Sequence, residues 1–170
     1  MRHDRRGPFQ SERIAYFITF RCHGTWLPGD ARGWTDRPGQ SRDLSLRSGH
    51  PGLLSMAQAA MAHCPSVLEA PHRETVGTAI REVCAHRGWT LHALNVRTNH
   101  VHVVVSAGST PEQVLTSLKA WSTRRLSEAG LAGEGIKPWS RHGSTRYLWR
   151  GDEIEAACSY VLEGQGGDLR

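Results

Sequence analysis

The sequence predicts an α+β fold in which an antiparallel sheet carries helices on one face. Alternating segments rich in β-branched and aromatic residues indicate strands, and apolar residues at helical spacing indicate helices between them. Two of the strand segments are separated by only two residues. With one long segment set aside, the order is strand, helix, strand, strand, helix, strand, which is the ferredoxin-like split βαβ arrangement. A last helix follows.

The first strand is expected over residues 14–22, which alternate in polarity and contain several aromatic residues. Residues 23–71 are dense in Gly, Pro, Arg and Asp, and we interpret them as an insertion with one helix over 55–63. An insertion of this length in a compact domain is often functional. The next helix is expected over 72–87, because apolar residues recur at helical spacing and Gly88 follows as a C-terminal cap.

Residues 89–97 and 100–106 form two predicted strands, which pair as a hairpin because the connection between them is short. A helix is expected over 110–129. Thr110 is its predicted N-cap, and Gln113 stands at the capping-box position.

The last third of the chain contains a predicted loop over residues 133–143 and a short strand over 146–149, in which we expect Trp149 to be a core residue. The final helix is expected over 152–163, with Asp152 as its cap and a glutamate three residues later.

The composition fits one domain over residues 1–170, with a length sufficient for a core. The formal net charge of +5 comes almost entirely from arginine, since Lys119 and Lys137 are the only lysines. A basic protein of this kind favours nucleic acid as a partner, although genome composition also produces an arginine bias.

Several protein classes are excluded by what the sequence lacks. None of its four cysteines forms a Cys-x-x-Cys pair, which argues against a structural zinc site. The N-terminus lacks the apolar segment of a signal peptide, and no apolar run approaches the ~18 residues of a membrane span. We therefore expect a cytoplasmic, nucleoid-associated protein that does not contact a membrane.

Two histidines, His100 and His102, stand two residues apart in a valine-rich strand. Residues at i and i+2 of a strand point to the same face, roughly 6–7 Å apart. Two imidazoles on one face can converge on a metal ion. The alternative is a pair of structural histidines held by hydrogen bonds.

Tyr160 lies outside the apolar stripe of the last helix. That stripe consists of Ile154, Ala157, Cys158, Val161 and Leu162. At ~100° per residue, Tyr160 falls roughly 130° from the centre of the stripe. Its hydroxyl is therefore expected either to face a site or to be exposed. A tyrosine oxygen can attack phosphorus, and a metal held by two histidines can polarise a phosphodiester.

Residues 98–104, which contain the histidine pair, resemble the His-hydrophobic-His (HUH) strand of the single-tyrosine transposases. Three more segments resemble the tyrosine helix, first strand and second helix of that family: residues 159–165, 18–21 and 117–121. The resemblance covers residues 14–22 and 72–165, and within this superfamily the chain is most similar to the REP-associated tyrosine transposases.

This resemblance implies an enzyme that nicks and rejoins single-stranded DNA near a hairpin. Tyr160 would be the nucleophile and would form a 5′-phosphotyrosine, leaving a free 3′-hydroxyl. His100 and His102 would hold Mg²⁺ or Mn²⁺ at the scissile phosphate. The resemblance leaves open whether the protein acts as a monomer or as a homodimer.

The third metal ligand of the family is a glutamine four residues after the tyrosine, where this chain has Gly164. Gln165 comes one residue later, and on a regular helix it would point toward the core stripe. Two possibilities stay open. Gly164 unwinds the helix end so that Gln165 turns back, or Glu163 supplies the oxygen ligand.

Basic and aromatic residues of the second half are candidates for contacts with DNA. Arginine and lysine can follow a phosphate backbone, and tryptophan can stack on unpaired bases. The candidates are Lys119, Arg124, Arg125, Arg141, Arg146, Arg150 and Trp139.

Two other functions compete with the nickase. Histidine-triad nucleotide hydrolases carry a third histidine two residues after a His-x-His pair, but that position is Val104 in this chain. A catalytically degenerate DNA-binding protein on the same fold is the second alternative, because the spacing from tyrosine to glutamine departs from the family pattern.

Overall fold

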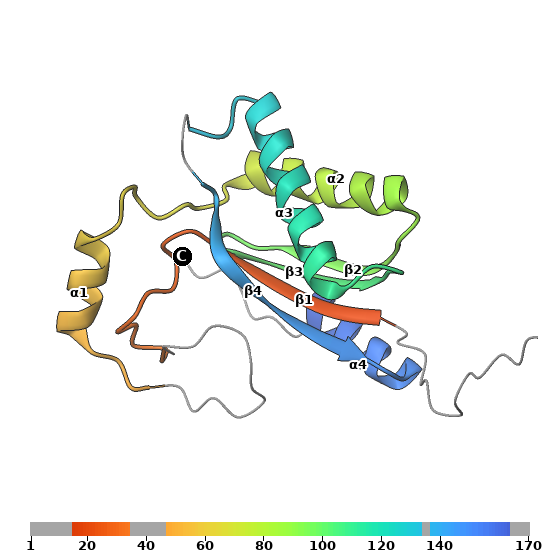
Figure 1. Cartoon of the computed structure of the whole chain (residues 1–170), viewed down its shortest axis with the longest axis horizontal. Helices are drawn as coiled ribbons and strands as arrows, with labels where there is room; N and C mark the ends of the chain where they lie inside the picture. Colours follow the sequence, from red (N-terminus) through yellow and green to blue (C-terminus); the bar gives the residue numbers. More distant parts are fainter. Residues whose placement is uncertain (1–14, 35–46, 134–136, 164–170) are drawn as a thin grey trace, which may run out of the picture.

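The computed structural model describes residues 15–34, 47–133 and 137–163. An open antiparallel sheet of four strands, in the order β2-β3-β1-β4, lies at its centre (Figure 1). The strands are β1 (Ala15–Cys22), β2 (Thr90–Val96), β3 (His100–Ser106) and β4 (Trp139–Leu148). This order confirms the predicted ferredoxin-like α+β fold, including the β2–β3 hairpin.

The helices of the described residues are α1 (Pro51–Ala59), α2 (Ala70–Arg87), α3 (Pro111–Glu128) and α4 (Gly151–Leu162). Helices α2 and α3 cover one face of the sheet, as predicted, whereas α4 lies against the opposite face (Figure 1). No helix in the described ranges is long and apolar enough to cross a membrane.

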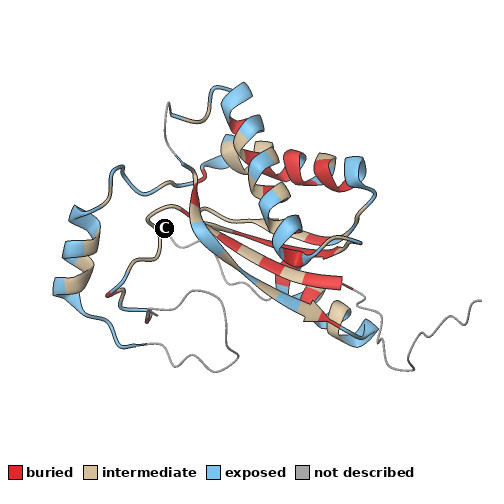
Figure 2. Cartoon of the chain, in the orientation of Figure 1, coloured by how far each residue is buried: buried red, intermediate tan, exposed pale blue. Residues whose placement is uncertain are grey.

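Alternation along β1 divides the apolar side chains between the two faces of the sheet. Ile18 and Phe20 are fully buried in the larger cluster, which α2 and α3 cover. Ala15 and Phe17 point the other way and pack in the smaller cluster, which α4 covers. The buried residues accordingly concentrate in the sheet and on the sides of the helices that face it (Figure 2).

Strand β4 is longer than the sequence predicts, because it includes residues 139–143 of the expected loop as well as residues 146–148 of the expected short strand. Its small and polar residues pair with β1, and an edge strand with a partly open face does not show the apolar alternation of a buried strand. The burial of the two tryptophans is the reverse of what the sequence predicts. Trp139 is buried edge-to-face against Phe20, while Trp149 is 37% exposed and is not a core residue.

The two predicted helix caps have different outcomes. Thr110 and Gln113 form the predicted capping box, in which the Thr110 N–H donates to Gln113 Oε1 at 3.1 Å. Helix α4 instead begins at Gly151, so Asp152 lies inside the first turn rather than at the cap. Asp152 forms an ion pair with Arg150, and its expected capping role is wrong.

The insertion contains one helix, as predicted, but over residues 51–59 rather than 55–63. No residue of α1 is buried, and the helix lies apart from the sheet (Figure 1). The ends of the insertion are attached to the sheet region by backbone hydrogen bonds. The Ser66 N–H donates to the His23 carbonyl at 2.9 Å, and the Leu68 N–H donates to the Thr98 carbonyl at 2.7 Å.

We expect Thr110→Ala to lower the free energy of unfolding by about 1 kcal/mol, because the Gln113 N–H loses its side-chain acceptor at the start of α3. Thr116→Ala is the matched control, since the Thr116 hydroxyl donates only to a carbonyl within the helix, and its effect should stay within ~0.5 kcal/mol. Denaturant unfolding followed by circular dichroism measures both variants. Equal losses would contradict the role assigned to the capping box.

Candidate active site

The candidate site lies on the sheet face that α4 partly covers. Residues directly opposite each other in an antiparallel pair share a face. The register of β1 with β3 pairs Thr19 with His102 and Arg21 with His100, and the register of β2 with β3 pairs Asn95 with His102. Polar side chains of three strands therefore meet on one face beside the end of α4.

The two histidines lie side by side, as the strand spacing predicts. The centroids of the His100 and His102 rings are 4.6 Å apart, with an interplanar angle of 80°. His102 is only 7% exposed and stacks on Phe17 at a centroid distance of 5.5 Å. Two imidazole rings this close on one face are candidates for holding a shared metal ion.

Each histidine is oriented by a hydrogen bond at Nδ1. Nδ1 of His102 lies 2.8 Å from Oγ1 of Thr19, and Nδ1 of His100 lies 2.6 Å from Oδ1 of Asn99. An amide oxygen only accepts, so in the neutral ring His100 donates through Nδ1 and its Nε2 carries the lone pair. Metal-binding histidines are typically oriented in this way, with Nε2 left as the ligand atom.

Tyr160 extends from α4 to the edge of the histidine pair. Its ring centroid is 6.0 Å from that of His102 and 6.0 Å from that of Phe17, in edge-to-face arrangements. The side chain is 49% exposed, so its hydroxyl remains accessible from solvent. The prediction that Tyr160 lies outside the core stripe and faces a different surface agrees with this placement.

Two kinds of contact fix α4 over the sheet. Ala157 and Val161 are buried against the smaller cluster, which includes Val104 at the centre of β3. Asn95 Nδ2 of β2 donates to the Val161 carbonyl at 2.7 Å, next to Tyr160 in the chain. The burial of Val104 under α4 also shows that the third position of a histidine triad is a core residue in this protein.

The third metal ligand is the least defined part of the site. Gln165 lies outside the described residues. Glu163 is exposed at the C-cap of α4, and within the described ranges no group of three or more His, Cys, Asp or Glu side chains is placed to hold a metal ion. The described residues thus bring together two candidate nitrogen ligands, His100 and His102, without Glu163.

Three neighbours of the predicted residues had no role assigned from the sequence. Thr19 and Asn99 hold the two histidine rings, and Arg21 stands across the strand pair from His100. The strand register identifies Thr19 and Arg21, and it becomes available only once β1 is known to lie next to β3.

Two of the predicted DNA-binding residues have their charges engaged within the protein. Lys119 Nζ donates to the carbonyls of Ser140 and His142 at 2.9 and 3.0 Å, and burial lowers its pKa. Arg125 forms ion pairs with Glu82 and Glu128 at 2.8 and 2.7 Å. These contacts join α3 to β4 and α2.

The remaining candidates differ in position. Arg146 faces the same side as the histidines, with its guanidinium carbon 5.8 Å from the centroid of Phe17. Arg141 is exposed on β4, Arg124 lies over an aromatic ring of α3, and Arg150 is ion-paired at the start of α4. Arg146 is therefore the predicted DNA contact that lies beside the candidate site.

Trp139 requires a correction. Its ring is 8% exposed, its Nε1 donates to Thr123 Oγ1 at 3.1 Å, and it packs on Phe20 in the larger cluster. A buried ring cannot stack on unpaired bases, so the expected DNA contact at Trp139 is wrong. The alternation of β4 places this residue on the core face.

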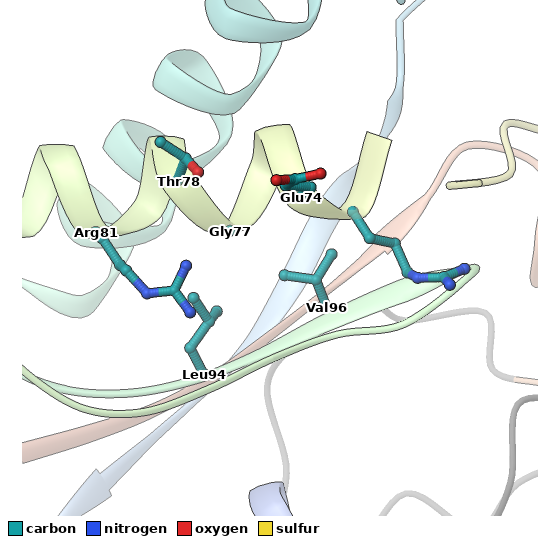
Figure 3. Close-up of a pocket in the computed structure, with 7 residues that line it drawn as sticks. Glu74, Gly77, Thr78, Arg81, Leu94 and Val96 are labelled. Atoms are coloured by element: carbon teal, nitrogen blue, oxygen red, sulfur yellow. The ribbon is translucent and has the colours of Figure 1, made fainter. Parts of the chain in front are cut away.

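A pocket of about 430 Å³ lies away from the histidines, between α2 and β2 (Figure 3). Its lining residues are Arg73, Glu74, Gly77, Thr78, Arg81, Leu94 and Val96. None of the predicted site residues is among them. The candidate site lies on the other face of the sheet.

Residues 63–143 match the family model described as "Transposase IS200 like". The matched segment contains α2, the hairpin with the histidine pair and α3, and it does not include Tyr160. No curated protein sequence matches the chain.

Two solved structures are similar to this chain. One is a REP-associated tyrosine transposase bound to a REP hairpin, with a TM-score of 0.50 and 13% identity, covering 95% of this chain and 70% of that chain. The other is a candidate transposase from Deinococcus radiodurans R1, with a TM-score of 0.47 and 16% identity, covering 97% of this chain and 98% of that chain. The predicted resemblance to the single-tyrosine transposases is confirmed, and the family match supports a transposase-like function in DNA processing.

We expect Thr19→Val to weaken Mn²⁺ binding about 10- to 100-fold, because His102 loses the partner that orients its ring. Thr145→Val is the control, since Thr145 pairs with Ile18 and so faces the other side of the sheet. Isothermal titration calorimetry measures both affinities. Unchanged Mn²⁺ affinity in Thr19→Val, with the fold intact, would contradict the role given to this hydrogen bond.

Proposed function

We propose that this protein cleaves and rejoins single-stranded DNA by a metal-dependent transesterification in which Tyr160 is the nucleophile. The observation that carries the proposal is the position of the accessible Tyr160 ring 6.0 Å from His102, beside a pair of histidines 4.6 Å apart. A tyrosine hydroxyl next to two neighbouring imidazoles supplies a nucleophile and two candidate metal ligands for phosphoryl transfer.

In the proposed reaction, the Tyr160 oxygen attacks the phosphorus of the scissile phosphodiester. The new bond joins phosphorus to the Tyr160 oxygen, which gives up its proton to solvent. The bond from phosphorus to the 3′-oxygen breaks, and the 3′-oxygen takes up a proton and leaves as a hydroxyl. The product is a 5′-phosphotyrosine, which retains the energy of one phosphodiester bond. A 3′-hydroxyl can attack that intermediate in turn, which restores Tyr160 and rejoins DNA without a nucleotide cofactor.

The residues of the site fit a divalent cation. Hydrogen bonds at Nδ1 orient both histidines, so Nε2 of His100 and Nε2 of His102 are the atoms that would hold it. When bound, Mg²⁺ or Mn²⁺ supplies Lewis-acid polarisation of the phosphate. We assign the third, oxygen-bearing ligand to Gln165, since Glu163 does not join the histidines in the described part of the chain.

We further propose a hairpin-forming repeat as the substrate. One structural neighbour is a REP-associated transposase bound to a REP hairpin, and the fold of this chain is similar to it. Exposed Arg146 lies beside Phe17 and the histidines, where a phosphate backbone that enters the site would pass.

A catalytically degenerate DNA-binding protein is the second candidate function. The observation that favours it is the ligand set, because the described residues supply two metal ligands and the family position of the third is Gly164. Binding of a preferred hairpin without any covalent product would support this candidate.

The proposed function predicts a covalent protein–DNA adduct. Incubation with labelled single-stranded hairpin oligonucleotides from repeats that flank the gene, in Mn²⁺, should give a product that migrates with the protein on a denaturing gel. Tyr160→Phe should abolish it, because the nucleophilic oxygen is gone, and His100→Ala/His102→Ala should reduce it at least 100-fold.

Tyr147→Phe is the matched control, since Tyr147 packs against Tyr16 and Trp149 away from the site. It should form the adduct at the wild-type rate. An adduct that persists in Tyr160→Phe would contradict the assignment of the nucleophile. Tight binding without an adduct in the wild type would favour the degenerate protein.

A further inference from the structure

We infer that Arg21 is a further catalytic residue, whose guanidinium binds the non-bridging oxygens of the scissile phosphate, and that the loop after β1 positions it. This inference rests on the proposed function of the Tyr160 site. It also gives a role to the first part of the insertion, residues 23–34.

The strand register places Arg21 on the catalytic face. Thr19 contacts His102 directly, and Arg21 follows two residues later, so both side chains leave β1 on the same side. Arg21 is also the direct partner of His100 across the β1–β3 pair. The Arg21 side chain therefore leaves β1 beside the histidine pair, on the polar part of the face that α4 leaves open.

The electrostatic surroundings agree with this position. Partial burial lowers the pKa of Arg21, and the charge of Arg32 lowers it further. The negative charges of Asp30 and of an ionised Tyr160 act in the opposite direction. Arginine keeps its charge throughout the accessible pH range, so Arg21 is a cation on this face of the sheet.

The hydrogen-bonding capacity of the Arg21 guanidinium is not used by the described residues. Within the described residues, no hydrogen bond or ion pair involves its guanidinium. Arg32, Arg125 and Arg150 are by contrast each paired with a carboxylate. A half-buried guanidinium has five donors and a fixed planar fork, which match two oxygens of one phosphate.

Trp26 holds this guanidinium in place. The Arg21 guanidinium carbon lies 4.0 Å from the Trp26 ring centroid, a close cation–π stack. The indole Nε1 donates to the Gly33 carbonyl at 2.6 Å, which fixes the ring. Stacking constrains the plane of the guanidinium and leaves its N–H edges available for a ligand.

The carboxylate of the same loop forms its ion pair with another arginine. Asp30 and Arg32 form an ion pair at 2.6 Å, and the hydrogen bond from Arg32 is the main reason that the pKa of Asp30 falls to about 2. Arg32 also donates to the Thr25 carbonyl at 2.7 Å, which closes the loop around Trp26. Asp30 therefore neutralises Arg32, and the charge of Arg21 remains available for a substrate phosphate.

This arrangement suits a phosphoryl transition state. Negative charge builds up on the phosphoryl oxygens as the Tyr160 oxygen approaches, and a fixed cation beside that position stabilises the transition state more than the ground state. Loss of one such donor typically costs ~100-fold or more in rate.

The first test compares single-turnover cleavage of a hairpin oligonucleotide by four proteins. Arg21→Ala should slow formation of the adduct about 100-fold, and Arg21→Lys should recover only part of the rate because it lacks the bidentate fork. Millimolar methylguanidine should partly restore Arg21→Ala, an effect that a misfolded variant would not show. Arg81→Ala, which removes an exposed arginine on the far side of the sheet, should react at the wild-type rate (Figure 3).

The role of Trp26 is tested with two substitutions. Trp26→Phe keeps an aromatic face and should retain most of the cleavage rate, whereas Trp26→Leu should lose about tenfold in the rate constant with little change in DNA affinity. Equal rates for Trp26→Phe and Trp26→Leu would overturn the positioning role.

A binding measurement separates failure of this inference from failure of the proposed function. Cleavage by Arg21→Ala at the wild-type rate would overturn the inference and leave the Tyr160 mechanism intact. If the wild type forms no adduct, the proposed mechanism fails, and affinity in metal-free buffer decides whether Arg21 contacts phosphate. A loss of about tenfold in Arg21→Ala, with a salt slope lower by about one, supports that contact, and unchanged affinity overturns it.

Discussion

The antiparallel pairing of β1 with β3 is the constraint on which the site depends. In this register Thr19 lies opposite His102, and Arg21 lies opposite His100. A hydrogen bond of 2.8 Å between Thr19 Oγ1 and His102 Nδ1 links the two strands at the site. A slip of one residue would turn Thr19 and Arg21 to the opposite face of the sheet, into the core beneath α2 and α3. The fully buried Ile18 and Phe20 fix the register against such a slip, since they occupy the core face. The packing of the core therefore determines the geometry of the site.

The second face of the sheet has two parts along its strands. An apolar part packs against α4, and a polar part forms the candidate site. Val104 and Phe17 pack against α4 in a small apolar cluster. Two residues further along each strand, the same face carries His102 and Thr19. Helix α4 covers the first part and ends near the second, so Tyr160 stands at the boundary. Tyr160 therefore combines a backbone held by buried contacts with a side chain that is 49% exposed, which suits the nucleophile of the proposed reaction.

The sequence alone predicts the features that depend on local pattern. The β2–β3 hairpin, the shared face of His100 and His102, and the capping box of α3 follow from spacing and residue type. The predictions that are wrong concern features that depend on tertiary contacts. Periodicity shows that α4 has an apolar stripe but not which face of the sheet receives it. Trp139 is buried and Trp149 is exposed because of the way β4 pairs with β1. The position of Arg21 follows from a strand register that joins segments about 80 residues apart.

The central claim of the proposed function is that His100 and His102 would hold a divalent cation that acts on the scissile phosphate beside Tyr160. Pulsed electron paramagnetic resonance of Mn²⁺ tests it most directly, with Tyr160→Phe protein bound to a hairpin oligonucleotide so that the DNA stays intact. The account predicts hyperfine coupling of the Mn²⁺ to two imidazole nitrogens and to one phosphorus, with the nitrogen couplings lost in the additional His100→Ala/His102→Ala variant. A Mn²⁺ signal that shows phosphorus coupling but no histidine nitrogen would contradict it.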